Sequence, residues 1–119
     1  MFNFEKLDIW QKAVEFADFA YVMTAAFPGD ERFGLTSQMR RAAVSTSSNI
    51  AERSSRSSRQ DFARFMELAT GSLYEAVSQA NIARRQCLIT EADCLRLYGL
   101  CDKQSKMLSG LRRTLLQNQ

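Results

Sequence analysis

The chain has 119 residues, enough for one domain that buries about two thirds of its unfolded surface, so no second domain is expected. Its residues are 45% hydrophobic and 24% charged, and one proline with five glycines favours long helices over a turn-rich β-sandwich. The formal net charge is +3 and there is no histidine, which excludes serine–histidine and cysteine–histidine catalysis and removes the commonest metal ligand.

The first helix is expected from Lys6 to about Ala26, and it carries two apolar stripes at helical spacing. One stripe consists of Leu7, Trp10, Val14, Ala17 and Tyr21. The other consists of Ile9, Phe16, Ala20, Met23 and Phe27. A helix on the outside of a small bundle needs one apolar face, so the second stripe indicates either deep burial or a contact with another subunit. In the latter case the predicted oligomer interface consists of Ile9, Phe16, Phe19 and Met23.

Pro28 and Gly29 end this helix, since proline lacks an amide donor and disfavours helical geometry in the residue before it. Thr36 can then cap a second helix that runs from Ser37 to about Arg53. Its narrow core face is expected to consist of Met39, Ala43, Thr46 and Ile50. The serines of the segment 54–58 compete with helical backbone bonds and predict a break.

A third helix is predicted after a cap at Ser57 or Ser58 and ends near Cys87. Apolar residues recur in it in steps of four and three, the spacing of a left-handed bundle seam. This seam consists of Phe62, Met66, Ala69, Leu73, Ala76, Ala80, Ala83 and Cys87. Its alanines, with Gly71 nearby, predict a close approach of the neighbouring helices.

A fourth helix is predicted after Thr90, whose hydroxyl can accept an amide, and the acids Glu91 and Asp93 suit the positive end of the helix dipole. Its buried face is expected to consist of Cys94, Leu97, Cys101, Leu108, Leu111 and Leu115. Short breaks at 28–36, 54–58 and 88–90 separate the four periodic segments. The sequence therefore predicts an all-α, antiparallel up-down four-helix bundle that forms a single domain over residues 1–119.

Charge is distributed unevenly along the chain. Residues 1–35 carry three basic and six acidic side chains, whereas residues 36–64 carry six arginines against Glu52 and Asp61. This asymmetry suits an anionic partner or the assembly of oppositely charged faces, and an ordinary solvated face is equally compatible with it. The residues expected to contact nucleic-acid phosphates are Arg40, Arg41, Arg53, Arg56, Arg59 and Arg64.

Residues that carry catalytic or metal chemistry are scarce, and we expect no enzyme activity, cofactor or metal. The three cysteines, Cys87, Cys94 and Cys101, lack a fourth ligand and Cys-x-x-Cys spacing, so small buried hydrophobes are predicted instead of a zinc site. The serines between Ser45 and Ser58 have no base near them in the sequence. Asn49 and Glu52 are expected to form buried hydrogen bonds between helices.

No secretory signal or membrane span is predicted. Glu5 and Asp8 stand where a signal peptide would need a basic end and an apolar run. The longest uncharged stretch near the start, from Phe19 to Phe27, is far shorter than the ~20 residues that cross a bilayer. An odd number of cysteines without a signal favours a reducing cytoplasm.

Several motifs resemble one known family. They are Leu35 to Arg41 with Ser48 to Glu52, Phe4 to Leu7 with Trp10 to Ala13, Phe27-Pro28 with Glu31, and Ala69 to Glu75. Together they resemble the bacterial four-helix-bundle proteins found in intervening sequences of 23S ribosomal RNA genes. Accessory proteins of diversity-generating retroelements resemble the same family. The family usually has a glycine after Asn-Ile-Ala-Glu, and this chain has Arg53 there, which adds a charge.

The resemblance implies a homo-oligomer in the form of a closed ring of five subunits, whereas periodicity alone does not choose a ring size. Two functions remain open. The first is an oligomer that binds RNA or DNA without sequence specificity through the arginines. The second is a protein-interaction or scaffold module with no nucleic-acid role, in which the arginines form salt bridges between subunits. Neither involves a small-molecule substrate or a membrane.

Overall fold

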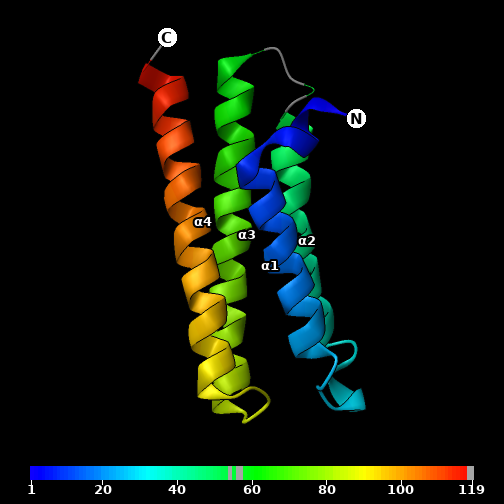
Figure 1. Ribbon diagram of the computed structural model, residues 1–119. Coiled ribbons are helices and arrows are strands. Elements are labelled where there is room, and N and C mark those ends of the chain that lie inside the picture. Colours follow the sequence, from blue (N-terminus) through cyan, green and yellow to red (C-terminus); the bar gives the residue numbers. More distant parts are fainter. Residues whose placement is uncertain (54, 56–57, 118–119) are drawn as a thin grey trace.

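Figure 1 shows the computed structural model of the chain. The structure describes residues 1–53, 55 and 58–117, and the side chains of these residues up to 114. Its elements are η1 (Asn3–Lys6), α1 (Asp8–Thr24), η2 (Gly29–Glu31), α2 (Leu35–Arg53), α3 (Arg59–Arg85) and α4 (Glu91–Gln117). No strand occurs in these residues, which confirms the prediction of an all-α protein with four main helices.

The four α-helices lie side by side, and α1 begins at the same end of the molecule at which α4 ends (Figure 1). Each helix packs against two others, because α1 and α3 each contact both α2 and α4. The apolar faces of all four helices meet in one core. None of the helices in the described part of the chain is long and apolar enough to span a bilayer.

The predicted seam of α3 is buried along most of its length. Met66, Ala69, Leu73, Ala76, Ala80 and Ala83 have at most 1% of their surface exposed, and Ala63 is buried beside them. Because most of these side chains are alanine, the backbone of α3 can lie close to its neighbours. The two ends of the predicted seam differ from its middle, since Phe62 is half-buried and Cys87 is exposed.

The helix starts follow the predicted capping residues at two of three positions. The hydroxyl of Ser58 accepts from the amide of Asp61 at 3.3 Å, and that of Thr90 accepts from Asp93 at 3.1 Å. Both caps satisfy an amide that has no partner within the helix. The predicted cap Thr36 lies inside α2, which begins at Leu35 because the carbonyl of Gly34 already accepts from the amide of Gln38.

Cys87 ends α3 in a backbone conformation that usually requires glycine. Its φ is 61°, in the left-handed region. The amide of Leu88 donates to the carbonyl of Ala83 and that of Cys87 to the carbonyl of Arg84, the two bonds of a Schellman motif. The prediction that Cys87 is buried was therefore wrong, because α3 ends at Arg85 and Cys87 belongs to the turn that follows the helix.

The residues of α1 predicted as a subunit contact are buried within the chain instead, which is the other alternative that their pattern left open. Ile9, Phe16, Phe19 and Met23, predicted as an oligomer interface, have at most 9% of their surface exposed and lie in the chain's own core. The reason is that α1 packs against both α2 and α4, so it needs a wide apolar face within one chain. Leu7, Trp10, Val14 and Ala17 of the other stripe are half-buried, and Tyr21 is exposed.

The buried face of α4 contains a polar residue that the sequence pattern did not mark. Leu97, Cys101 and Leu108 are buried as predicted, and Gln104 lies among them with 1% of its surface exposed. Its Nε2 donates to the carbonyl of Ile9 at 2.9 Å, which links α4 to α1. Cys94 and Leu111 are half-buried, and the side chain of Leu115 lies outside the described residues.

We expect Cys87→Gly to raise the free energy of unfolding by about 0.5–1 kcal/mol, because glycine adopts positive φ without a Cβ clash. Denaturant unfolding followed by circular dichroism measures this change. Cys87→Ala is the matched control, since it removes the thiol and keeps the clash. An equal gain from both variants would show that the thiol, and not the backbone, causes the effect.

We also expect Phe16→Ala to lower the free energy of unfolding by about 3–5 kcal/mol, the usual cost of removing a buried phenylalanine. Val22→Ala on the exposed side of α1 should change it by less than about 0.5 kcal/mol. Thermal unfolding of both variants tests this. If Phe16→Ala left the stability unchanged and reduced the mass of the assembly in solution, Phe16 would belong to a subunit interface.

Candidate interaction surfaces

Arg40, the first of the predicted phosphate contacts, is held between α1 and α2. Its Nε donates to the hydroxyl of Thr24 at 2.9 Å, and that hydroxyl donates to the carbonyl of Ala20 at 2.7 Å. The guanidinium also lies 4.5 Å from the centre of the Tyr21 ring. A hydrogen bond and a cation–π contact therefore orient Arg40 along its own chain, which reduces its use as a phosphate ligand.

Arg53 is half-buried at the end of α2. Its guanidinium lies 5.7 Å from the centre of the Phe62 ring on α3, and its buried Nε has no hydrogen-bond partner among the described residues. Burial lowers the pKa of this arginine, because removal from water disfavours the charged form. Arg53 thus helps to join α2 to α3.

Three more of the predicted arginines, Arg41, Arg59 and Arg64, are exposed. Arg41 lies on α2, and Arg59 and Arg64 lie on the first two turns of α3. Arg56 lies outside the described residues. The rise from Arg41 to Arg53 along α2 is about 18 Å. The structure therefore does not bring the five described arginines into one cluster.

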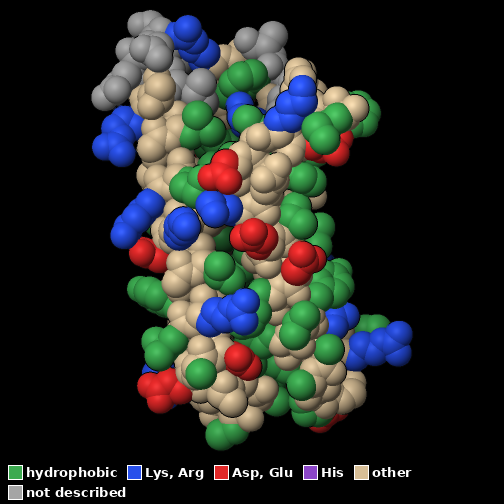
Figure 2. Space-filling model, viewed as in Figure 1, with side chains coloured by type: hydrophobic (Ala, Val, Ile, Leu, Met, Phe, Trp, Pro, Cys, Tyr) green, Lys and Arg blue, Asp and Glu red, His purple; other side chains and the backbone are tan. Residues whose placement is uncertain are grey.

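Charges of both signs are also interspersed on the face that Figure 2 shows, over α1 and α4. Arg112 of α4 pairs with Glu67 of α3 at 2.6 Å, and Arg84 of α3 pairs with Glu91 of α4 at 3.4 Å. Such exposed pairs contribute little to stability. They do neutralise part of the basic charge of the α3–α4 side.

Asn49 and Glu52, expected to bond between helices, behave differently from each other. The amide of Asn49 donates to the carbonyl of Ser45 within α2 at 2.9 Å, and the hydroxyl of Ser45 is 2.9 Å from that of Ser72 on α3. The hydroxyls of Ser45 and Ser72 thus form a hydrogen bond between α2 and α3. Glu52 is exposed.

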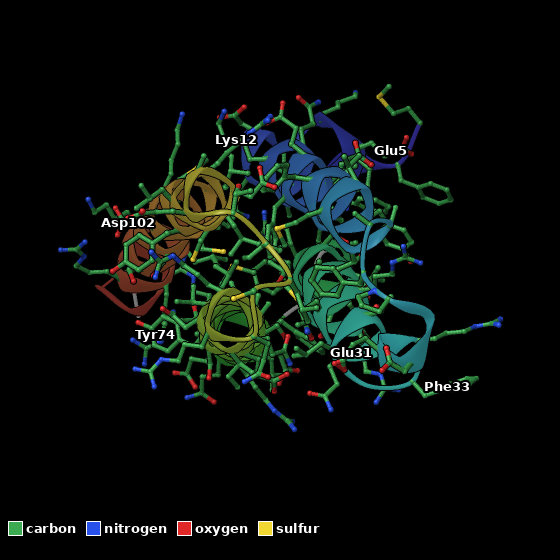
Figure 3. The ribbon with its side chains drawn as sticks, turned by 90° about the horizontal axis from the view of Figure 1, so that it is seen from below. Glu5, Lys12, Glu31, Phe33, Tyr74 and Asp102 are labelled. Atoms are coloured by element: carbon green, nitrogen blue, oxygen red, sulfur yellow. The ribbon has the colours of Figure 1, made fainter. Side chains whose placement is uncertain are left out.

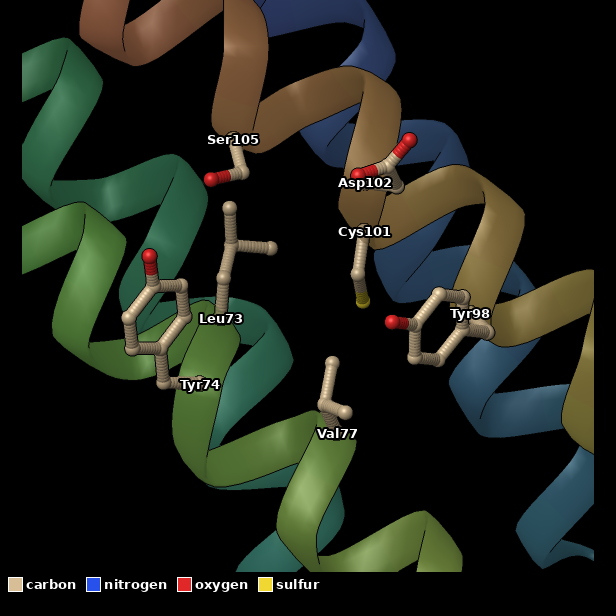
Figure 4. A pocket seen from close by; sticks show the side chains of 7 residues that line it. All are labelled: Leu73, Tyr74, Val77, Tyr98, Cys101, Asp102 and Ser105. Atoms are coloured by element: carbon tan, nitrogen blue, oxygen red, sulfur yellow. The ribbon is translucent and has the colours of Figure 1, made fainter.

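A groove lies between α3 and α4. Its volume is about 320 Å³, and its lining consists of Leu73, Tyr74, Val77, Tyr98, Cys101, Asp102 and Ser105. Figure 4 shows Tyr74 and Tyr98 on the two sides of the groove, with Leu73, Val77 and Cys101 between them. A shallower hollow continues from Tyr98 past Leu95 and Cys94 toward Arg84 and Glu91. We call the two hollows together the α3–α4 groove.

The α3–α4 groove exposes large apolar side chains beside each other. Tyr74 is 63% exposed, Leu95 65% and Tyr98 56%. Each of these residues directly follows one on the inner face of its helix: Tyr74 follows Leu73, Leu95 follows Cys94, and Tyr98 follows Leu97. The three side chains therefore point to the rim of the helix pair. Sequence reasoning missed this surface, and the signal that marks it is a large apolar side chain directly next to a position on the buried face of each helix.

The lining of the groove includes one thiol, that of Cys101. Burial raises the pKa of the Cys101 thiol to about 12, so the sulfur is protonated at neutral pH and is a poor nucleophile. In the part of the chain that the structure describes, no group of three or more potential ligands could hold a metal ion. The groove is an open surface lined by two tyrosines, with the carboxylate of Asp102 at its edge.

One family of known proteins matches the chain over most of its length. No protein with a curated description matches the chain. The model of the 23S rRNA-intervening sequence protein family matches residues 5–110, which include α1, α2, α3 and most of α4. The match covers the motifs around Trp10, Asn49 and Tyr74 that resemble the family, and the chain belongs to the 23S rRNA-intervening sequence protein family.

Proposed function

We propose that the protein is a non-enzymatic, self-associating interaction module, built as an antiparallel up-down bundle, whose α3–α4 groove is a subunit contact. The exposure of Tyr74, Leu95 and Tyr98 around one groove carries this proposal. Tyrosine is enriched in protein interfaces, because it combines a large apolar ring with a hydroxyl that can be satisfied at the rim. Grouped apolar residues on a surface typically mark a partner site.

Self-association fits this surface better than a small-molecule site. The groove is open along its length and lies on the outside of two helices, so a ligand of drug size would keep much of its surface in water. A neighbouring subunit can cover the groove and the exposed residues on both sides of it. Such a contact needs no change in the core, which is already closed within one chain.

We expect light scattering at micromolar concentration to give a mass above the monomer value of 13.5 kDa. Tyr98→Ser should raise the dissociation constant about tenfold or more, because it removes an aromatic anchor from the contact. Ile82→Ser is the control, since Ile82 is 48% exposed on α3 and does not line the groove. A monomeric natural protein would contradict the proposal.

Binding of nucleic acid without sequence specificity is a second candidate, supported by the exposure of Arg41, Arg59 and Arg64 on neighbouring helices. One subunit offers few phosphate contacts, and an oligomer repeats them, so that later contacts become intramolecular. Neither RNA nor DNA is favoured, because these positions supply charge and no base-stacking surface is interleaved with them.

For this candidate we expect generic RNA and duplex DNA to bind at low salt, with affinity that falls steeply as salt rises. Arg59→Ala with Arg64→Ala should weaken binding and reduce the slope of log affinity against log salt by roughly 0.7–0.9 for each lost phosphate contact. Arg85→Ala with Lys103→Ala, both exposed elsewhere, is the charge-matched control. Fluorescence anisotropy across a salt series measures the affinity of each variant. An equal loss of affinity in the two double variants would exclude a defined binding surface at Arg59 and Arg64.

A further inference from the structure

The turn between α1 and α2 exposes an aromatic side chain. Phe33 is 88% exposed, and the guanidinium of Arg32 lies 5.5 Å from the centre of its ring. Figure 3 shows Phe33 projecting away from the bundle. Burying a phenylalanine stabilises a protein by about 1.5–3 kcal/mol, so this turn leaves a substantial apolar contact unused within the chain. We call Arg32 and Phe33 the knob.

The backbone beneath the knob is well ordered by hydrogen bonds. The amides of Glu31, Arg32 and Gly34 donate to the carbonyls of Pro28, Gly29 and Glu31 at 3.0, 3.2 and 3.0 Å. These consecutive tight turns fix the chain on both sides of Phe33. A side chain presented from a fixed turn loses less conformational entropy on binding than one on a flexible loop.

The α3–α4 groove has the chemistry to receive an aromatic ring beside a cation. Tyr74 and Tyr98 offer two exposed rings, and Asp102 offers a carboxylate at the edge of the same hollow. Asp102 pairs with Lys106 one turn along α4 at 3.1 Å, but both side chains are more than half exposed. Such a pair contributes little, so the carboxylate can accept a second cation.

We infer that the knob of one copy enters the α3–α4 groove of a second copy, with Phe33 packing between Tyr74 and Tyr98 and Arg32 pairing with Asp102. This rests on the proposed self-association and names its two contact surfaces. Arg32 next to the tyrosine rings also gains a cation–π contact. An aromatic residue and an arginine are the side chains most often responsible for binding energy in interfaces.

The positions of the two surfaces require the contact to be head-to-tail. Figure 3 shows Phe33 on one side of the bundle, and Tyr74 and Asp102 on the opposite side. A chain therefore cannot fill its own groove, and each copy donates one knob and accepts another. Repetition of such a heterologous contact closes into a ring or continues as a filament.

A mixing experiment tests this geometry. We expect Phe33→Ser and Tyr98→Ser each to raise the dissociation constant about thirty-fold, the effect of losing an aromatic hot spot. An equimolar mixture of the two variants should form a dimer and nothing larger, because one keeps its groove and the other keeps its knob. Analytical ultracentrifugation resolves these species. Phe2→Ser is the matched control, since Phe2 is also exposed, at 73%, and lies outside the knob.

A charge exchange gives an independent test. Arg32→Glu and Asp102→Lys should each weaken assembly, and the double variant should restore it, whereas two unrelated surface charges would give additive losses. Circular dichroism should show unchanged helicity, because all the altered side chains are exposed.

The outcomes separate this contact from the proposed function. A monomeric natural protein overturns both. If Tyr98→Ser weakens the assembly and Phe33→Ser leaves it intact, the groove is a subunit contact but the knob does not fill it. The role of the knob is also overturned if the mixture of the two variants forms no dimer. Failure of the charge exchange to restore assembly overturns the pairing of Arg32 with Asp102.

Discussion

The close approach of α3 to its neighbours is the constraint on which the rest of the structure depends. Alanines at 63, 69, 76, 80 and 83 leave little space between α3 and the helices beside it, so hydroxyls as short as those of Ser45 and Ser72 meet across the α2–α3 contact. Tyr74 and Tyr98 stay exposed on the two sides of the α3–α4 groove, with Leu73, Val77 and Cys101 between them.

Polar contacts fix the relative positions of helices that apolar packing alone would let slide. Gln104 bonds to the carbonyl of Ile9 across α1 and α4, while its Oε1 has no partner among the described residues, which costs roughly 1–3 kcal/mol. Arg40 links α2 to Thr24 and Tyr21 of α1 in a comparable way. A buried polar group of this kind sets how two helices are aligned along their length. Any other alignment would leave the polar group without its partner and is therefore disfavoured.

These contacts also explain why arginines that are close together in the sequence have different surroundings in the fold. Six arginines fall along residues 40–64, and the five that the structure describes are divided between α2 and α3. Two of them contact aromatic rings of the same chain, at Tyr21 and Phe62. Among the described residues, the exposed side chains grouped around the α3–α4 groove are instead mainly apolar and aromatic.

The sequence by itself determined the helices, their capping residues Ser58 and Thr90, and the buried seam of α3, because helical periodicity and local hydrogen bonding are properties of short segments. It also carried the family motifs around Trp10, Asn49 and Tyr74. Only the tertiary structure decided which stripe of α1 faces the core, since two apolar stripes satisfy periodicity equally and the choice depends on where α2 and α4 lie. Likewise, only the packing of α3 on α4 placed Tyr98 and Asp102 in one groove with Tyr74, because residues far apart in the chain become neighbours through the distance between helices.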